Sequence, residues 1–259
     1  MTRGETRSAL DMRDLGLAYG EREVLRGINL RIDPGERVAL LGENGAGKSS
    51  LLRCITGLTT HQQGEVLLDG RPAADYPRAQ LARRIAVVQG QTMIAFPLRV
   101  EELVALGRIP HEHPLLGPRP ADRAAVAAAI DRVGVGHLVG RDVRQLSLGE
   151  RQLAVLAMSI AQQARLLLLD EPTAHLDLRH QVEVMQLLRR LSAEDGVTVL
   201  AVLHDVGLAS HFFKRVLLLH DGRLVADGPP ADVLTPARVR QVYGVDPRFV
   251  SLPGAAARA

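Results

Sequence analysis

The feature that most constrains this chain is a glycine-rich segment, GENGAGKS, at residues 42–49. An apolar run at residues 38–41 precedes it and predicts a strand, and residues 48–58 predict a helix. The order strand, G-x-x-x-x-G-K-S/T, helix is typical of a phosphate-binding loop. Such a loop turns backbone N–H groups toward an anion, and the helix adds the positive end of its dipole. The segment therefore predicts an α/β protein that binds the phosphates of a nucleotide.

The side chains of this segment have distinct expected roles. Lys48 would reach the β and γ phosphates, Ser49 would take one position on Mg²⁺, and Ser50 would be a further phosphate donor. Lysine is rare here, because only Lys48 and Lys214 are lysines among 32 basic residues. A glycine-rich turn without a ligand is the alternative, which the flanking strand and helix disfavour. The predicted nucleotide-binding residues of the loop are Gly42, Glu43, Asn44, Gly45, Ala46, Gly47, Lys48, Ser49 and Ser50.

Two carboxylates, Asp170 and Glu171, follow the four leucines of residues 166–169. The strands of open α/β sheets present ligand-binding residues at their carboxyl ends, which favours a functional site over a simple strand cap. Asp170 would hold Mg²⁺ through water, and Glu171 would polarise the water that attacks the γ phosphate. This pattern predicts that the bound nucleotide is hydrolysed.

Strand and helix patterns alternate along the rest of the chain. Ala-rich helical segments at residues 100–106 and 122–133 surround a Pro-rich linker at residues 110–120. We expect a P-loop NTPase core with a mostly parallel sheet and an antiparallel β subdomain, plus an inserted helical subdomain. The expected strands are residues 15–19, 24–32, 38–41, 65–69, 85–88, 165–170, 197–203 and 216–220.

Length and composition suit one domain with a substantial core, since 46% of the 259 residues are hydrophobic. The expected domain covers residues 1–250, followed by a flexible tail at 251–259. Its expected parts are a catalytic core at residues 8–95 and 159–230, a helical subdomain at 96–158 and a C-terminal helical segment at 231–250.

Net charge, cysteine content and hydropathy indicate which partners and which compartment to expect. The net charge is only +3, which gives no support for nucleic-acid binding. The single Cys54 cannot form an intrachain disulfide, and the first residues contain no signal-peptide core, so a reducing cytoplasm is expected. No run approaches the roughly 20 apolar residues of a membrane-spanning helix, so membrane association would require a partner.

A second potential anion site lies at residues 146–152, LSLGERQ, where a predicted helix begins. Taken alone, Ser147, Gly149 and Glu150 would form an ordinary helix cap. Together with the other motifs, this segment resembles the LSGGE signature of the ABC ATPase family, with Leu148 at a position that the family varies. The resemblance covers nearly the whole chain.

The resemblance implies a head-to-tail dimer of two copies that encloses two ATP molecules, with each signature segment completing the site of the other copy. Residues 174–177 resemble the D-loop, so Asp177 would contribute across that interface. Tyr19 resembles the aromatic residue that stacks on adenine. His204 resembles the switch histidine, which contacts the γ phosphate and positions the attacking water. In isolation Tyr19 would be a strand aromatic and His204 a satisfied histidine, but their order among the motifs favours function.

The Q-loop is less clear, because Gly90 stands where family members usually have glutamine. We prefer Gln89, which directly ends a predicted strand and could reach Mg²⁺ and the attacking water. Gln91 is the alternative.

Residues 104–111, 204–206, 233–236 and 240–245 resemble importers of iron siderophores, haem and vitamin B12. This resemblance implies a subunit at the cytoplasmic face of the inner membrane that powers a separate permease, with an external solute-binding protein. A groove formed by residues 96–144 and the Q-loop would receive a permease helix. The solute itself is not encoded on this chain.

Two other classes are weighed. ABC ATPases of DNA repair separate their nucleotide motifs with a long coiled coil, whereas Lys48 and Asp170 are only 122 positions apart. Translation factors usually fuse two cassettes, and a regulatory module without turnover would lack Glu171 or His204. The sequence therefore favours transport.

Overall fold

The computed structural model describes residues 8–90, 94–113 and 117–247. The chain divides into two compact units, Met1–Tyr76 with Leu191–Ala259, and Pro77–Arg190. The helical subdomain predicted at residues 96–158 does not coincide with either unit. Its predicted limits stay a prediction. Within the described ranges, no helix combines the length and apolar composition needed to cross a membrane.

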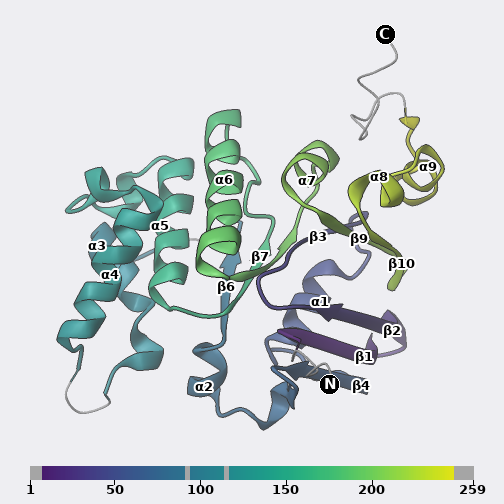
Figure 1. Cartoon of the computed structure of the whole chain (residues 1–259), viewed down its shortest axis with the longest axis horizontal. Coiled ribbons are helices and arrows are strands. Elements are labelled where there is room, and N and C mark those ends of the chain that lie inside the picture. Colours follow the sequence, from purple (N-terminus) through teal and green to yellow (C-terminus); the bar gives the residue numbers. More distant parts are fainter. Residues whose placement is uncertain (1–7, 91–93, 114–116, 248–259) are drawn as a thin grey trace, which may run out of the picture. The chain divides into compact units, whose positions relative to one another are not determined.

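The first unit contains an antiparallel sheet in the order β2-β1-β4-β5 (Figure 1). Buried apolar side chains alternate with more exposed ones along the first half of β1, the pattern of a sheet with one face in the core. This strand begins earlier than the sequence predicts because Leu10 and Met12 belong to that buried face. The four strands are β1 (Leu10–Tyr19), β2 (Arg22–Ile32), β4 (Gln63–Leu68) and β5 (Arg71–Pro72).

A second group of strands in this unit surrounds β3 (Arg37–Leu41). Strands β8 (Thr198–Val202) and β9 (Arg215–His220) pair with β3 in parallel on either side, and β10 (Arg223–Gly228) pairs antiparallel with β9. The buried residues of β3 and β8 run almost without interruption, as expected of parallel strands covered on both faces. The helices of the unit are α1 (Lys48–Ile55), α7 (Val206–Phe212), α8 (Pro230–Val233) and α9 (Pro236–Tyr243), with the 3-10 turn η1 (Ala73–Asp75).

In its described residues, the second unit has the parallel strands β6 (Ile85–Gln89) and β7 (Leu166–Asp170), and its other regular elements are helices (Figure 1). Its helices are α2 (Arg78–Ala82), α3 (Val100–Leu106), α4 (Pro120–Val133), α5 (Leu148–Ala161) and most of α6 (Leu178–Asp195). Three 3-10 turns connect them, η2 (Ile109–His111), η3 (Gly136–Leu138) and η4 (Val143–Gln145). The predicted α/β class, with parallel strands, an antiparallel sheet and additional helices, is confirmed.

A buried ion pair holds the helices of the second unit together. Arg108 follows α3, and its guanidinium lies 3.0 Å from the carboxylate of Asp122 in the first turn of α4. The same guanidinium donates to the carbonyl oxygen of Ala161 at the end of α5, 2.6 Å away. Both charged residues are more than nine-tenths buried, so each depends on the other for compensation of its charge.

Candidate functional site

The phosphate-binding segment of residues 42–47 connects β3 to α1. The Lys48 side chain is buried, and its Nζ donates to the carbonyl oxygens of Gly42 and Glu43 at 2.7 and 2.8 Å. Helix α1 begins at Lys48 with Gly47 as its N-cap, and no side chain caps its first turn. A helix start that lacks a side-chain cap directs N–H donors outward, and the lysine adds a fixed positive charge. This donor set suits a polyphosphate.

Tyr19 ends β1 with 48% of its surface exposed. Hydrogen bonds from Thr59 and then from Ser50 lower the pKa of its hydroxyl. Ser50 lies in the first turn of α1, so the phenol is tied to the helix that starts at the phosphate-binding segment. The exposed ring is thus available for stacking next to that helix.

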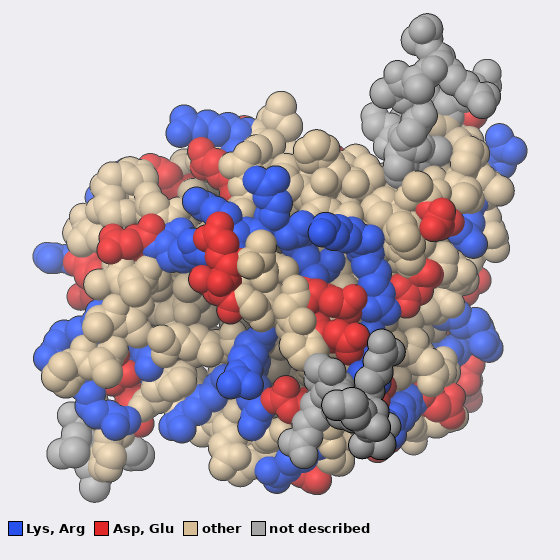
Figure 2. Space-filling view, viewed as in Figure 1, with Lys and Arg blue, Asp and Glu red and all other residues tan. Residues whose placement is uncertain are grey.

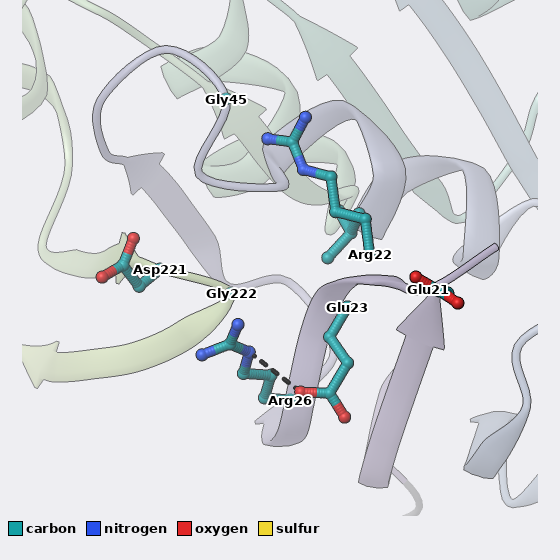
Figure 3. Close-up of a pocket in the computed structure, with 8 residues that line it drawn as sticks. Glu21, Arg22, Glu23, Arg26, Gly45, Asp221 and Gly222 are labelled. Carbon is teal, nitrogen blue, oxygen red and sulfur yellow. Dashed lines mark ion pairs between the residues drawn. The ribbon is translucent and has the colours of Figure 1, made fainter. Parts of the chain in front are cut away.

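A pocket of about 550 Å³ lies at the tip of the phosphate-binding segment, beside Gly45 (Figure 3). The guanidinium of Arg22 points toward this tip, whereas Arg26 is held by Glu23 in an ion pair of 3.2 Å. The sequence did not predict that Arg22 would line this pocket beside the phosphate-binding segment. In the sequence, Arg22 is only a basic residue three positions after Tyr19. Its position beside the phosphate-binding segment depends on where the turn between β1 and β2 lies in the fold.

His204 follows β8 at the edge where β3 delivers the phosphate-binding segment. The two strands pair in parallel, and Leu203 N donates to Leu40 O at 3.1 Å. His204 is exposed, and the next residue, Asp205, caps α7 through its carboxylate. The predicted switch histidine and the predicted phosphate-binding residues therefore lie at the carboxyl ends of neighbouring strands, the edge of open α/β sheets where ligands bind.

In the second unit, Asp170 is the last residue of β7 and Glu171 follows it directly. Asp170 Oδ1 is buried and, among the described residues, has no hydrogen-bond partner. A buried carboxylate oxygen without a donor is costly unless a cation or water occupies the position beside it, so this atom suits a hydrated Mg²⁺. Glu171 has a positive φ of 55°, an uncommon conformation for a residue with a side chain.

Gln89 pairs in register with Asp170 on the neighbouring parallel strand and is exposed. The next residue, Gly90, donates its N–H to Asp170 O at 2.7 Å. A Cβ atom at Gly90 would lie 2.1 Å from the carbonyl oxygen of Glu171. The backbone therefore leaves no room for a glutamine at the position where the family usually has one. Gln91, the other candidate, lies outside the described residues.

The signature segment forms a reciprocal helix cap at the start of α5. Ser147 Oγ accepts from Glu150 N at 3.2 Å, and Glu150 Oε2 accepts from Ser147 N at 2.8 Å. These bonds with Ser147, the backbone bond first, lower the pKa of Glu150. Arg141 adds an ion pair to Glu150 at 3.1 Å. The side chains of Ser147 and Glu150 therefore form their bonds within this chain.

The predicted site residues fall into two sets. The first unit holds Tyr19, the phosphate-binding segment and His204. The second unit holds Gln89, Asp170, Glu171, Ser147, Gly149, Glu150 and Asp177.

On the face shown in Figure 2, acidic side chains lie among the basic ones, in keeping with the small net charge.

A family model described as ABC transporter matches residues 25–174, which is more than half of the chain. The chain belongs to the ABC transporter family. The resemblance seen in the motifs is confirmed, and this ABC protein is an ATP-binding cassette with the ATPase activity expected of that family.

Curated relatives of this ABC protein cover most of its length. It is 40% identical to the hemin import ATP-binding protein HmuV of Bordetella avium over 92% of each chain. It is 43% identical to the protein of the same name from Pseudomonas putida, over 92% of this chain and 93% of that one. It is 38% identical to the ferric enterobactin transport ATP-binding protein FepC of Escherichia coli, over 89% of this chain and 85% of that protein.

Solved structures of ABC proteins share the fold. The protein cbiO1 of Clostridium perfringens, part of the ABC transporter complex cbiONQ, has a TM-score of 0.79 and 30% identity, covering 93% of this chain and 97% of that chain. A bacterial ABC transporter cassette described as dimeric has a TM-score of 0.74 and 28% identity, covering 85% of this chain and 98% of that chain.

Proposed function

We propose that this chain is the ATP-binding and ATP-hydrolysing subunit of an importer that drives uptake of haem or a related iron chelate through a separate membrane permease. The similarity to relatives named for hemin import carries this proposal, because it extends over more than nine-tenths of each chain. The FepC relative, named for ferric enterobactin transport, supports the wider class of metal chelates.

The chemistry proposed for the site follows from its donors and carboxylates. Lys48 and the N–H groups at the start of α1 would hold the phosphates. Ser49, Gln89 and the buried Asp170 Oδ1 would hold Mg²⁺, which when bound neutralises charge on the β and γ phosphates. Glu171 would polarise the attacking water, and His204 would position it. Tyr19 would stack on adenine.

Two copies would be needed to complete the sites. Helix α5 begins with a serine, a buried glycine and a glutamate, and the dimeric cassette among the similar structures supports pairing of this kind. Ser147, Gly149, Glu150 and Asp177 would then reach the nucleotide of the other copy. The assembly would lie on the cytoplasmic face of the inner membrane, attached to a permease and served by an external solute-binding protein.

The hydrolysis step is tested with Glu171→Gln. We expect this variant to bind ATP and to dimerise while turning over at least about 100-fold more slowly, because a general base contributes 10²-fold or more. Glu183→Gln is the matched control, since Glu183 lies on α6 in an exposed ion pair with Arg179. Full turnover by Glu171→Gln would overturn the assignment of the base.

The transport step is tested by co-expressing the chain with a membrane permease that binds it and measuring uptake of haem, a ferric siderophore and cobalamin. Uptake of haem that is lost with Lys48→Ala is the expected result. Uptake of cobalamin alone would correct the solute. ATPase activity stimulated by DNA or ribosomes, with no permease bound, would favour a soluble ABC ATPase instead.

A further inference from the structure

One side chain in the second unit, His180, contacts both segments that the family resemblance assigns to the opposite nucleotide. His180 lies in the first turn of α6, with 21% of its side chain exposed. It packs against Gly149, the second residue of α5. A Cβ atom added to Gly149 would lie 2.3 Å from Cγ and Cδ2 of the His180 ring. The ring therefore occupies the space where any larger residue 149 would place its side chain.

The same imidazole is bonded to Asp177 of the predicted D-loop. Asp177 Oδ1 accepts from the backbone N of His180 at 2.9 Å and from its ring Nδ1 at 2.8 Å. The backbone bond first, and then the ring bond, lower the pKa of Asp177. Because an ionised carboxylate can only accept, the ring carries a proton on Nδ1. Two-thirds of the Asp177 side chain remains exposed, so the two bonds to His180 set its direction.

Filling a hydrophobic core does not explain the ring. His180 lines a pocket of about 640 Å³ together with Ser147 and Glu150, so one side of the imidazole borders open space. The start of α5 is itself fixed by the cap between Ser147 and Glu150 and by the ion pair with Arg141. The start of α5 is fixed, the His180 ring lies on it, and the ring in turn bonds the exposed carboxylate of Asp177. The three parts form one continuous connection.

We propose that His180 is a positioning residue, which sets the spacing between Gly149 of the signature segment and Asp177 of the D-loop so that both meet the opposite nucleotide together. The proposal rests on the proposed function, because that function assigns the two segments to one nucleotide. His180 itself touches no nucleotide in this scheme. Its loss should therefore slow turnover and leave the affinity of the phosphate-binding segment for ATP unchanged.

The first experiment compares the full-length wild-type chain with His180→Ala, His180→Asn and His180→Phe. We expect His180→Ala to lower kcat roughly tenfold, since small misplacements of reacting groups cost up to about 100-fold. Affinity for a non-hydrolysed ATP analogue should stay within about twofold. His180→Asn keeps a donor close to the position of Nδ1 and should recover part of the turnover. His180→Phe keeps an aromatic ring on Gly149 and the backbone bond to Asp177 but loses the ring bond to Asp177, and it should not recover the turnover.

The control is His137→Ala. His137 is exposed, lines the same pocket and touches neither segment in any described contact, so kcat should be unchanged. Should His180→Ala fail to fold, His180→Asn and His180→Phe decide the question. Wild-type kcat in all His180 variants would overturn the proposal, whereas a wild-type chain without ATPase activity would overturn the proposed function instead.

A second experiment separates the two reasons for a glycine at position 149. Gly149→Ala should be strongly damaging in the wild type, because the added methyl group collides with the His180 ring. In the His180→Ala background, the same change should cause a smaller fold-loss of activity than in the wild type, because the ring is gone. Equal losses in both backgrounds would show that the glycine serves only the approach of the nucleotide, and would overturn the proposal.

Discussion

Gly90→Ala tests the closest approach of backbone segments at the candidate site. Gly90 directly follows β6, and its added Cβ would lie 2.1 Å from the carbonyl oxygen of Glu171. Real Cβ atoms essentially never come within 3.0 Å of another heavy atom, so the two segments must separate by about 0.9 Å. A flexible side chain could give way, but here the obstacle is the backbone of the proposed catalytic residue.

The magnitude follows from the nature of the obstacle. Overpacking a well-packed site costs about 1–3 kcal/mol, and a clash with backbone belongs at the upper end, near 3 kcal/mol. The N–H bond from Gly90 to Asp170 would be stretched at the same time. For a domain of this size, about 3 kcal/mol corresponds to a fall in Tm of about 6–12 °C. A displacement of Glu171 by nearly 1 Å should also lower turnover by about 100-fold.

Calorimetry and ATPase assays on two controls separate these effects. Gly107→Ala creates an equally short contact, 2.1 Å from the carbonyl oxygen of Met158, but at the far end of α5. It should lower Tm by a similar amount and leave kcat of the folded protein near that of the wild type. Gly136→Ala meets no atom within 4 Å and should change neither quantity. A Gly90→Ala variant with wild-type Tm and kcat would refute the steric argument.

Two further predictions concern titrating groups. Burial raises the pKa of the Cys54 thiol to about 11. At pH 8 an aromatic disulfide reagent should therefore label the native chain only slowly and the urea-unfolded chain quickly. Rapid labelling of the native chain would contradict the buried position of Cys54. Glu150 and Asp177 have lowered pKa values in the folded state, so their stabilisation is present above the ordinary carboxyl pKa of about 4 and is lost as pH falls through the folded values. Tm should therefore stay constant between pH 7 and about pH 5 and decrease at pH values below about 4. The decrease should be shallower in Glu150→Gln. An equal slope in that variant would count against the stabilising role of the helix cap.

The sequence determined the parts of this protein whose chemistry is local. A phosphate-binding loop is recognisable because its glycines, lysine and serine are adjacent, and the alternation of strands and helices follows from side-chain periodicity. The carboxylates after the leucines of β7 could be placed at a strand end for the same reason. The family followed from the order of these motifs along the chain, and the comparisons confirm it.

Only the tertiary structure decided the features that join distant residues. Nothing in residues 87–91 indicates that Gly90 lies against the carbonyl of Glu171, because β7 reaches that position only after the intervening helices α3, α4 and α5. The contact of His180 with Gly149, the buried pair of Arg108 and Asp122, and the approach of Arg22 to the phosphate-binding loop are of the same kind. Local propensity carries no record of such contacts, since packing between elements sets them. The sequence therefore indicated the candidate reacting groups, and the fold decided what surrounds and positions them.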